Sequence, residues 1–160
     1  MAWQDEMVQI TRFLINDIDK SSYSDSRLED TILISSQFLL TEIPFDNNYI
    51  IDITKVTLSP DPTTISPKDS AFIALACFRT SWFIAHLETL SAAKNCIRVT
   101  DGPSSLDATT IYAAKKQIED DLERQYNTKK LQFLAGDITA CAAIITPTTS
   151  QYLPGFFSPR

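Results

Sequence analysis

A single histidine, His86, is the side chain of this sequence best suited to acid–base chemistry near neutral pH. Catalysis would require a nucleophile or a carboxylate converging on the imidazole. The neighbouring sequence offers only Glu88, which falls on a different face of the same apolar segment. We therefore predict that His86 is a core or interface residue rather than a catalytic base.

Metal chemistry is limited by the small number of candidate ligands. A structural zinc site needs about four closely spaced cysteine or histidine ligands. Besides His86, the sequence has three widely separated cysteines, Cys77, Cys96 and Cys141, with no C-x-x-C pair. No zinc site is expected, and the odd cysteine count favours a reducing compartment during assembly. Cys77 lies in an apolar run and is predicted to be a small buried hydrophobic residue.

The segment 17–25 has a partial likeness to a calcium-binding loop. Ser22 stands where an EF-hand needs glycine, and Leu28 stands where it needs a bidentate glutamate. Four residues occupy ligand positions of such a loop: Asp17, Asp19, Ser21 and Asp25. The missing glycine and glutamate favour a polar turn between two helices, with capping side chains.

The remaining patterns give no catalytic, cofactor-binding or metal site. The acidic run Glu119-Asp120-Asp121 lies in a helical segment flanked by lysines, which predicts a solvated face. Only 3 of 160 residues are glycine, and they form no phosphate-binding loop or nucleophile elbow. We predict that the chain is not an enzyme and binds no cofactor.

Helical spacing and capping residues predict two helices in the first third of the chain, over about 2–15 and from a Ser24 cap to about Thr41. The second helix should bury Leu28, Ile32, Ser35 or Ser36, and Leu39. A short strand is expected at 49–53, followed by a loop at 58–66.

The third helix is expected to be central. Ser66 is the predicted N-cap, Pro67 the first helical residue and Asp69 the capping-box residue. In Ala71–Leu87, 13 of 17 residues are apolar and lie all round the helix, so every side must be covered by its own domain or by a neighbouring subunit. Arg79 interrupts this stretch, which is shorter than a membrane span of roughly 20 residues. We predict a core helix.

A strand at 96–100 and a turn at 101–103 should precede a fourth helix that is capped by Asp107 and ends near Ala135, with Gly136 as the C-cap. Three oppositely charged pairs are four residues apart and are predicted to form ion pairs that stabilise this helix on its surface: Lys115/Glu119, Lys116/Asp120 and Asp120/Arg124. A narrow apolar stripe contains Ile111, Ile118 and Leu122.

The sequence thus predicts a mainly α fold, a small bundle of about four helices with short β segments and an extended C-terminal arm. The helical domain covers 1–136 and the arm 137–160. From Ile138 to Pro159 the arm has no charged residue, so it needs a surface to lie on, either of another subunit or of its own domain. Its predicted interface residues are Ile144, Ile145, Tyr152, Leu153, Phe156 and Phe157.

Charge argues against nucleic acid as the main partner. Residues 1–64 contain eleven acidic and four basic side chains, a net charge of −7, and residues 65–160 contain nine and ten, a net of +1. Phosphate binding needs clustered lysine and arginine. The first residues include Asp5 and Glu6 and no apolar run, so no signal peptide is expected, and no membrane partner is predicted.

Several local strings resemble the head–tail connector (adaptor, or head-completion) proteins of tailed bacteriophages over about residues 8–136. They are Arg12-Phe13-Leu14-Ile15-Asn16-Asp17, Ser59-Pro60-Asp61-Pro62, Asp69-Ser70-Ala71-Phe72-Ile73, and the run from Ile97 to Asp107 before a long charged helix. The resemblance implies a helical subunit of a ring, typically of twelve copies, between the portal and the next neck or tail protein.

This resemblance also implies a virion protein that is assembled in the host cytoplasm and extends the DNA channel, through which DNA passes without sequence-specific binding. A C-terminal arm in such proteins often inserts into the portal or a neighbouring subunit. The alternative is a non-enzymatic helical interaction module that binds one protein partner through its C-terminal arm.

Overall fold

The computed structural model of the chain describes residues 3–94, 98–101, 104–107 and 109–136. Four helices form most of this part: α1 (Trp3–Leu14), α2 (Asp25–Glu42), α3 (Ser70–Lys94) and α4 (Thr109–Leu134). Two short antiparallel pairs complete it, β1 (Ile50–Asp52) with β2 (Thr57–Ser59), and β3 (Arg98–Asp101) with β4 (Ser104–Asp107). The predicted fold, a small mainly α bundle of about four helices with short β segments, is confirmed.

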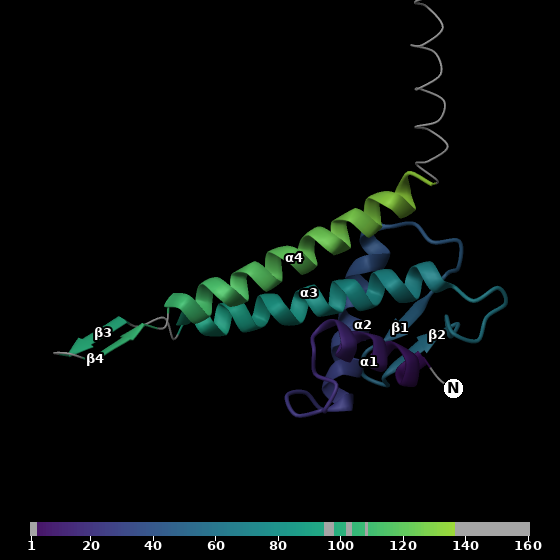
Figure 1. Cartoon of the computed structure of the whole chain (residues 1–160). Helices are drawn as coiled ribbons and strands as arrows, with labels where there is room; N and C mark the ends of the chain where they lie inside the picture. Colours follow the sequence, from purple (N-terminus) through teal and green to yellow (C-terminus); the bar gives the residue numbers. More distant parts are fainter. Residues whose placement is uncertain (1–2, 95–97, 102–103, 108, 137–160) are drawn as a thin grey trace, which may run out of the picture.

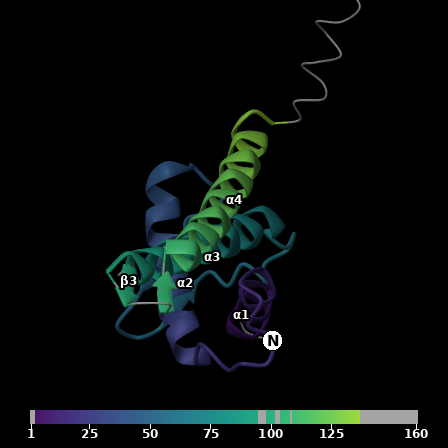
Figure 2. The ribbon, with the colours of Figure 1, turned by 60° about the vertical axis from the view of Figure 1, so that its left-hand side comes forward.

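The long helices α3 and α4 lie side by side and antiparallel (Figure 1), as paired contacts along them show. Arg79 meets Tyr126, and one and a half to two turns further along α3, His86 meets Glu119. The helices α1 and α2 and the β1–β2 pair gather around the first part of α3, whereas β3–β4 lies at the far end of the hairpin (Figures 1 and 2). One half of the α3–α4 pair therefore belongs to a packed body, and the other half extends from it.

The core forms where α1 and α2 pack on α3. Fully buried side chains of α3 include Phe72, Ala76 and Cys77, and they meet Met7 of α1 and Leu28 of α2 in one cluster. As predicted, Cys77 is buried, and burial raises the pKa of its thiol to about 12. The remaining buried apolar side chains of α2 are Ile32, Leu33 and Leu39, and Ser35 and Ser36 are buried beside them. The predicted buried face of α2 is confirmed.

The end of α1 and the start of α2 follow local rules. Asn16 adopts a left-handed conformation (φ 57°), and the backbone N–H groups of Asn16 and Asp17 donate to the carbonyls of Phe13 and Arg12. This is a Schellman motif, in which asparagine is the usual alternative to glycine. Ser24 caps α2 by accepting a hydrogen bond from the backbone N–H of Arg27, as predicted.

The predicted start of α3 at Pro67 is wrong, because the helix begins at Ser70 with Asp69 as its cap. The Asp69 Oδ1 atom accepts a hydrogen bond from the backbone N–H of Phe72 at 2.9 Å. Its Oδ2 atom accepts from the Tyr49 hydroxyl at 2.7 Å and from the Asn47 amide at 3.1 Å. A side chain fixed by two distant partners becomes the cap in preference to Ser66. At its other end α3 continues seven residues beyond Leu87, to Lys94.

Two boundaries in the β segments also differ from the sequence prediction. The expected loop at 58–66 begins inside β2, which pairs Leu58 with Ile51 of β1. Asp107, the predicted cap of α4, is the last residue of β4, paired with Arg98, and α4 begins at Thr109. At the other end of α4 the predicted C-cap is confirmed. Gly136 has φ 63° and its N–H donates to the carbonyl of Phe133.

The helix α3 is long and apolar enough to cross a membrane, judged by length and composition alone. In its most apolar 18-residue window, 44% of the residues are buried inside the described part of the chain. Of its ionisable side chains, Arg79 and His86 are bonded to carboxylates of other helices. The buried residues fit a core helix, and the rest of the apolar surface needs a separate explanation.

Candidate assembly interface

The helix α3 is not covered on every side by the rest of the described chain. Leu87 remains 44% exposed, and Leu90 is similarly exposed one turn further along. On α2, Phe38 is half-exposed, because it lies outside the buried face that carries Leu28, Ile32 and Leu39. Sequence reasoning missed these side chains as surface residues. Phe38 could have been identified from its position off that buried face.

The exposed apolar side chains border two hollows between α2 and α3, which we call the α2–α3 groove. The first hollow has a volume of about 260 Å³ and is lined by Phe38, Arg79, Trp82, Phe83 and His86. The second has a volume of about 230 Å³ and is lined by Tyr23, Arg27, Thr31, Ile84, Leu87, Glu88 and Ser91. The first hollow has aromatic walls and the second a more polar wall, and because their α3 residues are offset by five positions, the two hollows lie on different faces of that helix.

Four exposed apolar side chains of the hairpin lie on α4: Ile111, Ile118, Leu131 and Leu134. Ile111 and Ile118 are 58% and 57% exposed, are seven residues apart and share one face, which we call the α4 isoleucine strip. Leu131 and Leu134 lie nearer the other end of α4. The predicted stripe of Ile111, Ile118 and Leu122 is correct only in part, because Leu122 is buried.

Leu87 of α3 and the α4 isoleucine strip lie on opposite sides of the hairpin. In an antiparallel pair of helices, residues that follow a contacting pair turn toward one side, and residues that precede it turn toward the other. The contact is His86 with Glu119. Leu87 follows His86, and Ile118 precedes Glu119, so these side chains point to opposite sides.

Charged side chains next to the groove are paired within the subunit, except Arg27, whose guanidinium lies over the ring of Tyr23. Near its first hollow, the Glu42 carboxylate bonds Arg79, accepts a hydrogen bond from the Tyr126 hydroxyl at 2.8 Å and pairs with Lys130 at 2.6 Å. Burial alone would raise the pKa of Glu42, but the bonds from Lys130, Tyr126 and Arg79 outweigh it and lower that pKa. Burial also raises the pKa of Tyr126, to about 12, with a further contribution from Glu42. We call these four residues the Glu42 knot.

His86 and Glu119 form a second connection between α3 and α4. The His86 Nδ1 atom lies 2.9 Å from the Glu119 Oε1 atom. His86 was predicted as a core or interface residue, and it is half-exposed, so it is not a core residue. The prediction that Glu119 is solvated is wrong, because Glu119 faces α3 and is buried. Burial alone would raise the pKa of Glu119, but the hydrogen bonds from His86, Thr89 and Lys116 outweigh it, so that pKa is lowered.

A third connection lies at the second hollow. The Tyr23 hydroxyl donates to one carboxylate oxygen of Glu88, and Lys115 pairs with the other at 2.6 Å. Of the three predicted pairs on α4, only Lys116 with Asp120 is present, at 2.8 Å. Lys115 instead bonds Glu88 of α3, and Arg124 instead bonds Asp121 at 2.6 Å.

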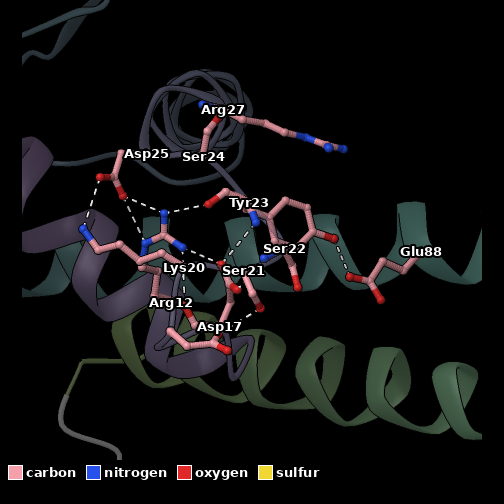
Figure 3. A network of polar contacts seen from close by, with 11 residues as sticks. Arg12, Asp17, Lys20, Ser21, Ser22, Tyr23, Ser24, Asp25, Arg27 and Glu88 are labelled. Carbon is pink, nitrogen blue, oxygen red and sulfur yellow. Dashed lines mark hydrogen bonds and ion pairs between the residues drawn. The ribbon is translucent and has the colours of Figure 1, made fainter.

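The segment considered as a calcium loop is built around a guanidinium group (Figure 3). Arg12 bonds the Asp17 carboxylate, donates to the Tyr23 carbonyl at 2.8 Å and pairs with Asp25 at 2.6 Å. Asp17 also accepts hydrogen bonds from the backbone N–H of Ser22 at 2.9 Å and of Tyr23 at 3.3 Å. Those backbone bonds and the Arg12 charge lower the pKa of Asp17 against the opposing effect of burial. The prediction of a polar, capped turn between helices is confirmed.

The structure does not test the predicted anchors of the arm. Ile144, Ile145, Tyr152, Leu153, Phe156 and Phe157 lie outside the described residues, as do Cys96 and Cys141. Within the described residues, no group of three or more histidine, cysteine, aspartate or glutamate side chains is placed to hold a metal ion. The site that the described chain presents is therefore an interaction surface on two sides of one helical hairpin.

The comparisons with known proteins add no assignment to this geometry. No protein family model, curated protein or solved structure matches the chain.

Proposed function

We propose that the chain is a virion structural protein of a phage neck, which forms a ring between the portal and the next neck or tail protein. The observation that carries this proposal is the α3–α4 hairpin, which exposes apolar side chains on two opposite sides while Arg79, His86 and Glu88 of α3 are bonded to side chains of the same subunit. Exposed apolar surface of this kind marks contacts with other proteins. A subunit with one such surface on each side is suited to having a neighbour on each side.

The strings that resemble connector proteins coincide with elements of the fold, which supports the same proposal. Arg12 and Asp17 bond each other at the end of α1, and Asp69 caps α3. The run from Ile97 to Asp107 covers β3 and β4, and the long charged helix that follows is α4. The strings that carry the resemblance therefore lie where helices of the domain begin or end, rather than at isolated surface positions.

The proposal extends to the channel and the arm. The ring, of about twelve copies by the resemblance, extends the DNA channel, and the acidic surplus of −6 lets DNA pass without specific binding. Assembly takes place in the host cytoplasm. The arm, residues 137–160, attaches the subunit to the portal or to a neighbour through the six anchors named above.

Cryo-electron microscopy of the full chain mixed with its portal ring tests this function. We expect a ring of this chain seated on the portal, with density for residues 137–160 crossing a subunit boundary. A chain that remains a monomer and does not bind the portal would favour the interaction module that binds a single partner.

A shortened chain separates attachment from folding. Deletion of residues 148–160 should leave the helical circular-dichroism signal unchanged and weaken binding to the portal. The matched control is the full chain with Phe13→Glu on α1, a change at an exposed residue far from the arm in sequence, which should bind normally. If the deletion instead abolishes the helical signal, the arm belongs to the core of its own domain.

A further inference from the structure

We propose that in the free subunit the arm turns back and places Ile144 and Ile145 in an apolar hollow between α1 and α3 of its own chain. This inference goes beyond the proposed function, because it concerns the subunit before assembly and does not need a portal. Its basis is a hollow that the described residues leave open, next to the point where the described chain ends.

The hollow, which we call the α1–α3 hollow, has a volume of about 250 Å³. Residues four apart on one face of each helix line it. They are Glu6, Ile10 and Leu14 of α1, and Ser70, Ala74 and Phe78 of α3. Ile10, Leu14 and Phe78 pack against the core and remain only partly buried. The small side chains of Ser70 and Ala74 leave room beside these larger ones, and apolar side chains from elsewhere would cover the hollow most favourably.

The charged groups at the hollow favour an uncharged occupant. The Lys68 Nζ atom lies 2.5 Å and 2.8 Å from the two carboxylate oxygens of Glu6. Because these two charges pair with each other, neither needs a partner from the segment that covers the hollow. The arm has no charged residue from Ile138 to Pro159, so it would bury no unpaired charge there.

The described chain ends at the level of this hollow. Phe72 lies near the start of α3 and Phe133 near the end of α4, and the centroids of both rings lie 5.2 Å from that of Phe45. In the antiparallel pair, Ser70, two residues before Phe72, is therefore level with Ala135, two residues after Phe133. The arm starts beside the end of the hollow that Ser70 lines.

The arm is long enough to reach the hollow from there. The helices α4 and α1 lie on different sides of α3 (Figures 1 and 2), so the arm must pass about half-way round α3. A helix with its side chains is about 10–12 Å across, so this path is roughly 18 Å. The left-handed Gly136 ends α4, and Ile144 follows eight residues later, an extended length of about 26–29 Å.

The other hollows suit the arm less well. One beside α1 is lined by five charged side chains. The second hollow of the α2–α3 groove contains Arg27 and Glu88. The first hollow of that groove is apolar, but it begins at Arg79, which contacts Tyr126, ten residues or about 15 Å back from Gly136. Of these hollows, the α1–α3 hollow is the apolar one at the start of the arm.

Covalent attachment favours the arm of the same chain over the arm of a second copy. A segment on a short tether meets its site at an effective concentration of about 1 mM. At micromolar protein, the arm of a second copy would be roughly 1,000-fold more dilute. The free subunit should therefore fill the hollow with its own arm.

Methyl NMR of the full-length chain tests the contact. We expect nuclear Overhauser effects between the two arm isoleucines and Ile10 or Leu14, and these should persist on dilution. Ala74→Leu fills the hollow with an apolar side chain and should abolish them. Ala93→Leu is the matched control, because it makes the same change at an exposed position of the same helix outside the hollow, and it should leave them unchanged.

A change on the arm keeps the test decisive even if Ala74→Leu disturbs folding. The double variant Ile144→Ser/Ile145→Ser alters no described residue. It should shift the methyl signals of Ile10 and Leu14 and leave those of Leu39, which is fully buried on α2. Circular dichroism of each variant checks that the helices are intact.

Mixing isotope-labelled with unlabelled copies separates contacts within one molecule from contacts between copies. Contacts within one molecule support the inference. Contacts only between copies would overturn it and show that subunits exchange arms. Ile10 and Leu14 signals that do not respond to the arm variant would also overturn it. A ring on the portal without this contact leaves the neck function standing, whereas the contact without any ring leaves this inference standing and the neck function fails.

Discussion

Removing the guanidinium group of Arg12 should destabilise the domain more than a change at an exposed residue of the loop that this group holds. Arg12→Met keeps the length and the apolar stem of the side chain. It removes the bonds to the carboxylates of Asp17 and Asp25 and to the carbonyl of Tyr23. Arg12 is 4% exposed and Asp17 is 3% exposed, so water cannot replace the lost partner.

The expected loss can be worked out from what remains. Breaking a buried ion pair by removing one partner costs about 3–5 kcal/mol. The lower end applies here, because Asp17 keeps the N–H groups of Ser22 and Tyr23, and the half-exposed Asp25 keeps Lys20 and water. We therefore expect Arg12→Met to lower the free energy of unfolding by about 3 kcal/mol. For a chain of this size, that loss lowers Tm by about 6–12 °C.

Urea unfolding followed by circular dichroism at pH 7 measures this loss as a lower midpoint at unchanged slope. The double variant Arg12→Met/Asp17→Asn should be more stable than Arg12→Met alone, because a neutral amide oxygen still accepts the Ser22 N–H without a buried charge. Lys20→Met is the matched control. Lys20 makes an exposed pair with Asp25, and its loss should cost less than about 0.5 kcal/mol. A loss below about 1 kcal/mol for Arg12→Met, or no recovery in the double variant, would refute this account of the loop.

Three further predictions concern stability. Asn16→Gly should stabilise the domain by up to about 1 kcal/mol in urea unfolding, because glycine adopts the left-handed conformation at lower cost; a loss of stability would contradict the Schellman assignment. Tyr126→Phe should cost about 1–2 kcal/mol in the same assay, since the buried hydroxyl bonds two charged groups; a neutral effect would show that the Glu42 knot does not need it. The folded-state pKa values of Glu42, Glu88 and Glu119 lie below the ordinary 4.5. These ionised carboxylates therefore add to the free energy of unfolding above that pH, and this contribution is lost as the pH falls through the lowered values. Glu119→Gln should therefore flatten the fall of stability as the pH drops below about 4.5, and an unchanged slope would argue against its lowered pKa.

Local signals made several ends and faces of the helices predictable. Ser24 as a cap, the spacing of Leu28, Ile32 and Leu39, and Gly136 after α4 all act within a few residues, and the structure bears each of them out. The polar turn between α1 and α2 was also predictable. Its central residue, Arg12, was not, because an arginine inside a helix gives no sign that it will bond one carboxylate of the following loop and another at the start of the next helix.

Features set by distant partners were not predictable from the sequence. Asp69 became the cap of α3 because Tyr49 and Asn47 hold its carboxylate, and Glu119 is buried because α3 lies against that face of α4. Periodicity showed that the α3 segment is apolar all round, but not which of its sides the body covers. The exposed Leu87 and the groove beside it therefore appear only in three dimensions.

The position of the Tyr23–Glu88 hydrogen bond has a mechanical consequence. Beyond the Glu42 knot at Arg79, this bond still holds α3 to the segment before α2, and α3 continues only six residues further to Lys94, a length of about 9 Å. A rotation of about 10° at Glu88 would move Lys94 by about 1.6 Å, by the geometry of that length. The end of α3 can therefore shift only slightly against the body unless the Tyr23–Glu88 bond opens.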